Sequence, residues 1–297
     1  MRILVTGATG FVGGQLVEEL LAAGHEVRAL VRDPSRYDAP DGVEVFQGDV
    51  LDRGSFEDSL SGVDAAYYLI HSMYAGEDFE ERDRLAARNF TRAASDAGVE
   101  RIVYLGGLGE TGDQLSAHLR SRREVEYILG DGTPELTTLR ASIIVGAGSV
   151  SFQIVTQLVK RLPVMIAPQW VRTQCQPIAV SDALAYLVGV VESPETAGQT
   201  YEIGGPDVLT YGEMLQQTAL AMDRRPPPIV PVPVLTPKLS SYWVGLVSDV
   251  DWQVARPLIH GLKNPTIVTD DSIREYVDPE LTPFREAVQR ALAEAES

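Results

Sequence analysis

Thr6-Gly7-Ala8-Thr9-Gly10-Phe11-Val12-Gly13 is a glycine-rich stretch that joins an apolar run, residues 2–6, to an amphipathic pattern over residues 12–23. Gly7 allows a tight turn, Gly10 lets the backbone approach a pyrophosphate, and Gly13 lets a helix pack closely on a strand. The helix N-terminus adds unpaired N–H groups and the positive end of its dipole. A strand, a glycine turn and a helix in this order predict a dinucleotide-binding loop. The alternative is a glycine turn that serves packing only.

The first half of the chain alternates between short apolar runs and helical patterns. The runs predict strands at 2–6, 26–31, 43–47, 64–70, 101–105 and 136–140, and the patterns predict helices at 12–23, 85–97 and 120–129. Strands that alternate with helices favour parallel pairing and a sheet covered on both faces. The predicted fold class is therefore α/β, a Rossmann-type doubly wound parallel sheet, with residues 1–146 as its dinucleotide-binding core.

Residues 147–297 are less regular and predict a smaller C-terminal α+β substrate cap, intertwined with the core in one structural domain. Helices are expected at 152–161, 181–191, 210–222 and 283–296, and a strand at 201–203. Ser181 is a candidate N-cap, and Thr210 with Glu213 forms a candidate capping box. The proline-dense segment 225–237 is expected to run extended over the surface or line a cleft.

The chain is strongly acidic, with 42 Asp and Glu against 25 Lys and Arg, a net charge of −17. Such a charge repels phosphate backbones and anionic membrane surfaces, so we expect no nucleic-acid partner. Only three cations are lysines, Lys160, Lys238 and Lys263. A carboxylate-rich surface with little lysine favours adaptation to high salt; surplus carboxylates that serve solubility are the simpler alternative.

Other compositional signals point to a reducing compartment. Cys175 is the single cysteine, so no intrachain disulfide can form. No apolar run reaches the length of a membrane span, and the first residues lack the layout of a signal peptide. We therefore predict a cytoplasmic protein without a transmembrane segment. The four histidines are scattered at His25, His71, His118 and His260, which predicts no metal site.

Two further positions bear on the cofactor. Arg32 and Asp33 follow the second predicted strand, where an arginine accommodates the 2′-phosphate of NADP and a carboxylate binds the ribose of NAD. Because Arg32 comes first, NADP(H) is favoured and NAD(H) is the alternative. After the third strand, Asp49 is a candidate for the adenine amino group and Val50 for the adenine ring. The competing interpretation of Asp49 is a simple turn aspartate.

The motifs together resemble the extended and atypical short-chain dehydrogenase/reductase superfamily. The resemblance covers nearly the whole chain and rests on the glycine loop, on Gly48-Asp49-Val50-Leu51-Asp52, on the segment from Asn89 to Tyr104, on Val180-Ser181-Asp182-Ala183 and on Tyr201-Glu202-Ile203-Gly204-Gly205-Pro206. Segments 66–73 and 119–122 look most like an atypical NAD(P)H-binding branch, similar to NmrA-like regulators and to the accessory subunit of respiratory complex I. The resemblance implies the same fold and cofactor class.

The predicted cofactor contacts include the ends of several strands besides the glycine loop. The full set is Thr6, Gly7, Thr9, Gly10, Phe11, Val12, Gly13, Arg32, Asp49, Val50, Leu69, Ile70, His71, Leu105, Gly106, Arg122, Ala141 and Ile143.

The catalytic residues depart from the superfamily pattern. Its redox chemistry normally uses a Tyr-x-x-x-Lys pair, which occurs nowhere in this sequence, and a hydroxyl at the end of the fifth strand, where Gly106 and Gly107 stand. His118 and Arg122 have the i, i+4 spacing of that pair on one helical face. In one interpretation His118 is the acid/base, with a pKa near neutrality that Arg122 lowers further, and Arg122 binds ribose or phosphate. His71 is a second acid/base candidate. In the other interpretation the site is a catalytic relic.

Three functions follow from these alternatives. The leading hypothesis is an oxidoreductase that transfers a hydride between the nicotinamide and a carbonyl, enone or quinone-type substrate in the C-terminal cleft. The second is a non-catalytic dinucleotide-binding sensor, scaffold or respiratory-complex accessory protein. The third is a sugar-nucleotide epimerase or dehydratase, which is disfavoured because that chemistry uses the tyrosine that is missing here. Trp170, Arg172, Gln174, Tyr242 and Trp243 are candidate pocket residues of the cap. The oligomeric state stays open.

Overall fold

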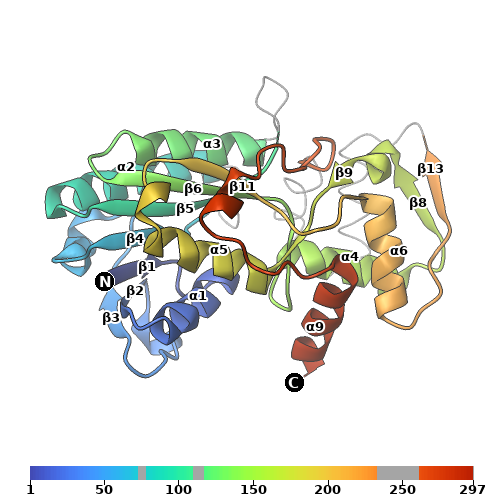
Figure 1. Cartoon of the computed structure of the whole chain (residues 1–297), viewed down its shortest axis with the longest axis horizontal. Helices are drawn as coiled ribbons and strands as arrows, with labels where there is room; N and C mark the ends of the chain where they lie inside the picture. The colour runs from blue at the N-terminus through green and yellow to red at the C-terminus, as the bar shows by residue number, and fades with distance from the viewer. Residues whose placement is uncertain (73–77, 110–116, 233–260, 297) are drawn as a thin grey trace.

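A computed structural model describes residues 1–72, 78–109, 117–232 and 261–296 of the chain. Its centre is a seven-stranded parallel sheet with the order β11-β6-β5-β4-β1-β2-β3 (Figure 1). The strand order reverses between β1 and β4, so the fold class predicted from the sequence is confirmed. The strands are β1 (Arg2–Thr6), β2 (Glu26–Val31), β3 (Glu44–Gln47), β4 (Ala65–Tyr68), β5 (Arg101–Gly107), β6 (Glu135–Ala141) and β11 (Thr200–Ile203).

Helices cover both faces of this sheet. On one face lie α2 (Phe79–Ala97) and α3 (Ala117–Gly130), and on the other α1 (Phe11–Ala22) and α5 (Val180–Glu192) (Figure 1). Neighbouring strand residues enter opposite cores: Tyr67 packs with α1 and α5, whereas Tyr68 packs with α2 and α3. Burial on both faces explains why these strands are apolar throughout rather than alternating.

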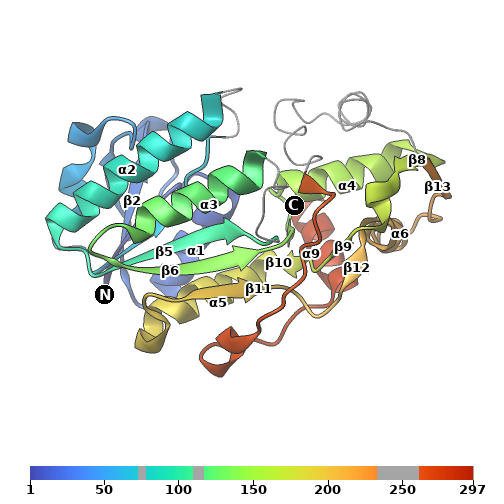
Figure 2. The same cartoon turned by 90° about the horizontal axis from the view of Figure 1, so that it is seen from above.

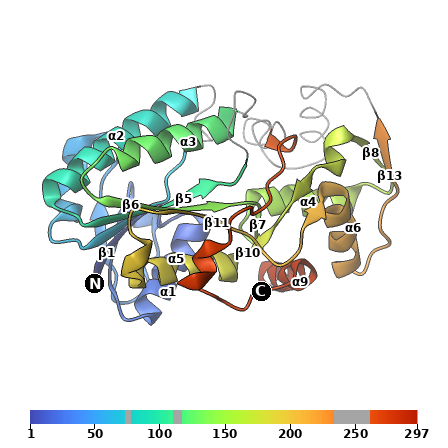
Figure 3. The ribbon, with the colours of Figure 1, turned by 45° about the horizontal axis from the view of Figure 1, so that its top comes forward.

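The C-terminal half builds a smaller layer beyond the carboxyl ends of the main strands (Figures 2 and 3). Three helices, α4 (Val150–Arg161), α6 (Tyr211–Ala221) and α9 (Phe284–Glu296), contribute most of a separate apolar core. Three two-stranded sheets accompany them: β7 (Ile144–Val145) with β10 (Ile178–Ala179), β8 (Met165–Pro168) with β13 (Ile229–Val232), and β9 (Gln174–Cys175) with β12 (Leu209–Thr210).

The two halves share structure. The chain returns from the smaller layer to the main sheet, to which it adds α5 and β11, and Arg101 of β5 donates to the carbonyl of Val190 at 2.8 Å. Short 3₁₀ turns connect the elements: Pro34–Arg36, Arg53–Ser55, Glu57–Leu60, Gln169–Arg172, Pro194–Thr196 and Ser272–Glu275. A core of 1–146 with a cap of 147–297 stays a prediction.

Helix caps show where local sequence signals succeed and fail. The capping box of Thr210 and Glu213 is confirmed at the start of α6. The predicted N-cap at Ser181 is wrong: α5 begins at Val180, and its N-cap is Ala179. The reason is that β10 runs directly into α5, so the backbone turns before Ser181, whose hydroxyl donates to Asp182 at 3.0 Å.

Several helices are longer than predicted. Helix α2 begins at Phe79 rather than at residue 85, and α3 begins at Ala117 rather than at residue 120.

In the proline-dense segment, β13 runs extended and pairs with β8. Tyr242 and Trp243 lie outside the described residues. None of the helices in the described ranges has the length and apolar character required to cross a bilayer.

Candidate functional site

A cavity of about 370 Å³ opens beside the glycine loop, at the carboxyl ends of β1, β4, β5 and β6. Ligands of doubly wound sheets bind at this edge, next to the point where the strand order reverses. The smaller layer borders the other side of the cavity, chiefly with apolar residues of α4 and α6. The cavity therefore joins the predicted cofactor loop to the C-terminal half.

The glycine loop has the close contacts that its spacing predicts. Gly7 has a left-handed backbone, φ +72°, and a Cβ there would lie 2.9 Å from the carbonyl oxygen of Leu69. A Cβ on Gly13 would lie 2.2 Å from the carbonyl oxygen of Gly7. Gly10 is the N-cap of α1 and supplies no capping side chain, so the first N–H groups of the helix stay available to a ligand. This cradle fits a pyrophosphate.

The predicted cofactor residues, those of the glycine loop included, separate into residues that line the cavity and residues that do not. Those that line the cavity are Gly7, Gly10, Phe11, Val12, Gly13, Leu69, His71, Leu105, Gly106, Arg122, Ala141 and Ile143. Those that do not are Thr6, Thr9, Arg32, Asp49, Val50 and Ile70. Thr6 is fully buried; its hydroxyl donates to the Tyr67 carbonyl at 2.9 Å and accepts from the Leu69 N–H at 3.2 Å. Thr6 thus fastens β1 to the end of β4.

Some of the polar side chains at the ends of β2 and β3 already have hydrogen-bond partners within the protein, and others do not. Asp33 accepts from the N–H of Ser35 at 3.1 Å and from its hydroxyl at 2.6 Å, so its carboxylate caps a 3₁₀ turn. Arg32 is exposed, and the described residues record no hydrogen bond or ion pair of its guanidinium. Asp49 accepts from the N–H of Leu51 at 2.9 Å, which is the geometry of a turn aspartate. Val50, the next residue, is buried.

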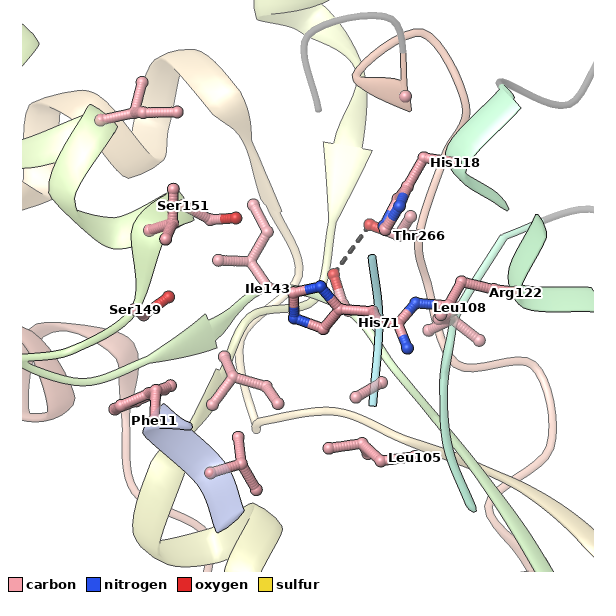
Figure 4. Close-up of a pocket in the computed structure, with 18 of the residues that line it drawn as sticks. Phe11, His71, Leu105, Leu108, His118, Arg122, Ile143, Ser149, Ser151 and Thr266 are labelled. Atoms are coloured by element: carbon pink, nitrogen blue, oxygen red, sulfur yellow. Dashed lines mark hydrogen bonds between the residues drawn. The ribbon is translucent and has the colours of Figure 1, made fainter. Parts of the chain in front are cut away.

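Three nitrogen-bearing side chains from two elements point into the middle of the cavity. His71 follows β4, and His118 and Arg122 lie one turn apart on α3 (Figure 4). The pKa of His118 is lowered to about 3, first by burial and then by the charges of Arg122 and His71. The surrounding protein and Arg122 likewise lower the pKa of His71 to about 3, although that side chain opens onto the cavity. At neutral pH both imidazoles are uncharged, and Arg122 supplies the local positive charge.

The end of β5 carries no hydroxyl. Gly106 and Gly107 line the cavity there. A Cβ on Gly106 would lie 3.2 Å from the Tyr104 ring. Tyr104 itself is buried on the opposite face, with its hydroxyl donating to the carbonyl of Arg122 at 3.2 Å. Tyr104 is therefore a packing residue beneath α3.

Asp83 of α2 is a residue that the sequence did not single out. It is only 4% exposed, and its two carboxylate oxygens accept from the N–H of Ser72 at 2.7 Å and from the hydroxyl of Ser121 at 2.9 Å. Ser72 follows His71 in the chain, and Ser121 precedes Arg122. One buried carboxylate thus ties together the two segments that carry the polar cluster. No local motif marks such a residue, because its partners lie 11 and 38 positions away.

The smaller layer contributes the apolar wall. Its members are Ile154, Val155 and Leu158 of α4, Met214 and Leu215 of α6, and Trp170, Tyr211 and Leu262. Trp170 and Tyr211 meet edge to face with ring centroids 5.9 Å apart. Of the cap candidates, Trp170 lines the cavity, whereas Arg172 and Gln174 do not. Arg122 is the single Lys or Arg among the described lining residues, and the described ranges hold no group of three or more metal-ligating side chains.

Comparisons with known proteins agree with this geometry. A family model described as NAD(P)H-binding matches residues 7–142. The chain is 30% identical over 230 residues, 75% of its length and 74% of the relative's, to the (4-alkanoyl-5-oxo-2,5-dihydrofuran-3-yl)methyl phosphate reductase of Streptomyces griseus. The chain is also similar to the mitochondrial NADH dehydrogenase [ubiquinone] 1 alpha subcomplex subunit 9 of Arabidopsis thaliana. The identity is 26% over an alignment 301 residues long, which covers 95% of this chain and 74% of the relative.

A solved structure extends the likeness to the whole fold. The NADP(H) complex of a triphenylmethane reductase from Citrobacter sp. superposes with a TM-score of 0.77 over 98% of this chain and 100% of that one, at 22% identity. The shared architecture therefore includes the layer beyond the sheet as well as the dinucleotide-binding half.

Proposed function

Since the chain belongs to the NAD(P)H-binding superfamily of short-chain reductases, dehydratases and epimerases, we propose that it is an NAD(P)H-dependent oxidoreductase that reduces an apolar carbonyl, enone or quinone-type compound. One observation carries the proposal: a single cavity runs from the glycine loop, past His71, His118 and Arg122, to an apolar wall. Such a cavity would let a dinucleotide at the glycine loop meet a second molecule at the apolar wall.

The chain's own residues have defined tasks in this reaction. A dinucleotide held at the glycine loop would supply a hydride for the carbonyl carbon, and the carbonyl oxygen would gain one proton from solvent. Arg122 is a fixed cation that stabilises the negative charge developing on that oxygen. His71 and His118, whose pKa values lie near 3, act as uncharged N–H donors toward the substrate. The apolar wall excludes water and strengthens these interactions.

We propose NADP(H) as the preferred cofactor, on the basis of Arg32. Its guanidinium has no recorded partner at the end of β2, while the neighbouring Asp33 is engaged in capping a turn. The cofactor assignment is tested by calorimetric titration with NADPH and NADH. We expect the wild type to favour NADPH, and Arg32→Ala to lose on the order of 10- to 100-fold of NADPH affinity with little change for NADH. Arg88→Ala, which removes an equal charge from the exposed face of α2, is the control. Equal affinities of the wild type for the two cofactors would reject this assignment.

The proposed substrate class rests on the apolar residues of α4 and α6 that line the cavity. Long stretches of α4 and α6 present aliphatic and aromatic side chains, and the described lining offers one guanidinium near the polar cluster. A sugar nucleotide requires cations for its phosphates and polar partners for its hydroxyls. The chain also lacks the tyrosine on which epimerases and dehydratases of the superfamily rely. An apolar substrate with one reducible oxygen-bearing group fits better.

A second candidate function has its own support. The similarity to a subunit of a respiratory NADH dehydrogenase and the absence of a Tyr-x-x-x-Lys pair favour a dinucleotide-binding accessory protein without turnover. The lone Cys175 is compatible with either function in a reducing, cytoplasmic setting.

The two functions are separated by one experiment. NADPH oxidation is followed at 340 nm with 1,4-naphthoquinone, chalcone and 2-naphthaldehyde, and NADPH binding is measured on the same preparation. We expect turnover with at least one acceptor, and a kcat lowered at least 100-fold in Arg122→Gln. Tight NADPH binding without oxidation by any acceptor would reject the reductase and favour the accessory protein.

A further inference from the structure

Two hydroxyl groups meet in the cavity at the edge where the β5 hydroxyl of the superfamily is missing. Ser142, directly after β6, and Thr266, from the C-terminal segment, form a hydrogen bond of 2.8 Å, and both line the cavity. Figure 4 labels Thr266 and draws this bond as a dashed line. The strand register pairs Gly107 with Ala141. Ser142 therefore lies one position beyond the partner of the glycine at which β5 ends.

Thr266 is held in place by its backbone. Its N–H donates to the carbonyl of Gln174 at 3.1 Å, and its carbonyl accepts from the N–H of Gln176 at 2.9 Å. These bonds fix the Thr266 side chain opposite Ser142. The hydroxyl pair thus joins the end of the main sheet to the smaller layer.

The phenol of Tyr211 is a third hydroxyl among the residues that line the cavity. Burial, and secondarily Cys175, raises the pKa of Tyr211 above its ordinary value, so the phenol keeps its proton at neutral pH. The recorded hydrogen bond among these hydroxyls is the one between Ser142 and Thr266, in which either hydroxyl can donate.

Counting hydrogens shows what the Ser142–Thr266 pair can still donate. Two hydroxyls have two hydrogens, and the bond between them uses one, so one hydrogen stays available whichever hydroxyl donates. With Thr266 as the donor, the available hydrogen belongs to Ser142, whose hydroxyl has no other recorded bond in the described part of the chain. Both residues line the cavity, so this hydrogen can serve a ligand there.

We propose that the Ser142–Thr266 pair is the site that orients the substrate oxygen, with Ser142 donating a hydrogen bond to a carbonyl. The pair supplies, from the end of β6, the hydroxyl that the glycines at the end of β5 cannot supply. The ligand class is an apolar compound that carries a carbonyl acceptor. The inference rests on the proposed function for its biological meaning, but the binding site can be tested without turnover.

The test compares two ligands of one shape. 2-Acetylnaphthalene and 2-isopropenylnaphthalene differ by a carbonyl oxygen in place of a methylene group, and each is titrated calorimetrically into the full-length protein saturated with NADP⁺. We expect the wild type to bind the ketone about tenfold more tightly than the hydrocarbon. Ser142→Ala should remove the preference, and Ser142→Thr, which keeps the hydroxyl, should retain it. Thr266→Val should reduce the preference because Ser142 then loses the partner that orients it.

A matched control is Thr156→Val on α4, whose hydroxyl donates to the carbonyl of Gln153 at 3.0 Å and which does not line the cavity. The ketone preference should persist in that variant. Equal binding of the two ligands by the wild type, a preference that survives Ser142→Ala, or failure of both ligands to bind would overturn the proposal. A ketone preference without any NADPH oxidation would support the site and reject the reductase function instead.

Discussion

At the residue scale, glycines shape one half of the site and buried polar groups the other. Gly13 is required because α1 passes so close to the turn before it that a Cβ would overlap the carbonyl oxygen of Gly7. The imidazoles of His71 and His118 are neutral because the protein surrounds them and places Arg122 nearby. The first effect follows from short-range geometry, whereas the second depends on what the fold packs around each ring.

We expect Gly13→Ala to weaken NADPH binding at least tenfold. The added Cβ would lie 2.2 Å from the Gly7 carbonyl oxygen, so α1 must move away from the loop. A shift of this kind also costs roughly 1–3 kcal/mol of stability. The measurement is calorimetric NADPH titration, with circular dichroism to verify folding. Gly130→Ala, where the Cβ would lie 3.5 Å from Leu136, is the matched control, and unchanged affinity in Gly13→Ala would contradict the expected role.

The lowered pKa of His118 predicts how the free energy of unfolding depends on pH. Between pH 6.5 and about 3, the unfolded chain binds a proton at His118 that the folded chain does not, so stability falls as pH falls through this range. At pH 5 the cost is about 2 kcal/mol, since 1.5 pH units separate that pH from the unfolded pKa. His118→Gln should therefore lose about 2 kcal/mol less stability than the wild type between pH 7 and pH 5, as measured by urea unfolding. Parallel pH profiles would show that the folded pKa is not lowered.

At the element scale, the site depends on how α2 and α3 are joined. An exposed ion pair links Glu80 to Arg120 at 2.8 Å, a half-buried one links Arg84 to Glu124 at 2.9 Å, and the buried Asp83 accepts from Ser121 between them. Exposed pairs of this kind contribute little to stability. The buried carboxylate is different, because removing it leaves a backbone N–H and a hydroxyl without their acceptor.

We expect Asp83→Ala to lower kcat about tenfold and to leave the KM for NADPH nearly unchanged. Without the carboxylate, the segments that carry His71 and Arg122 are no longer held at a fixed separation, while the glycine loop is untouched. The loss of stability should be about 2 kcal/mol. Asp83→Asn keeps a carbonyl acceptor and an amide donor and should recover part of kcat.

Glu80→Gln serves as the control for Asp83, since it breaks an exposed pair between the same two helices. If kcat changes equally in Glu80→Gln and Asp83→Ala, general loosening of the helix pair explains the effect and a specific positioning role does not.

At the scale of the whole molecule, the charge of −17 acts on stability and on cofactor binding together. Like charges repel in the compact state, and the Debye length falls from about 10 Å at 0.1 M salt to about 3 Å at 1 M. The proposed cofactor is itself a polyanion, so we expect its binding to depend on the N-terminus of α1 and on local cations such as Arg122.

We expect the thermal midpoint of unfolding to rise by several degrees between 0.05 and 2 M KCl, and NADPH affinity to rise over the same range. Differential scanning calorimetry and fluorescence titration measure the two quantities. A protein that is already at full stability in dilute buffer would contradict adaptation to high salt, and weaker NADPH binding in salt would show that local attraction outweighs the global repulsion.

The amino-acid sequence by itself determined the glycine loop, the parallel alternation of strands and helices, and the capping box at Thr210. Each depends on residues a few positions apart, whose geometry is nearly independent of the rest of the chain. The position of the start of α5 was not determined in this way, because the preceding strand moves the turn ahead of Ser181.

Only the tertiary structure showed that Ser142, Thr266 and Asp83 belong with the predicted residues His71, His118 and Arg122. His71, His118 and Ser142 follow or precede different strands, and Thr266 comes from the last segment of the chain; they meet because the sheet order brings the ends of β4, β5 and β6 to one edge. Burial at that edge, which no spacing in the sequence records, lowers the histidine pKa values and leaves Asp83 as the brace between two helices. Contacts between distant segments and the exclusion of water are properties of the packed chain, and for that reason they appear only in the fold.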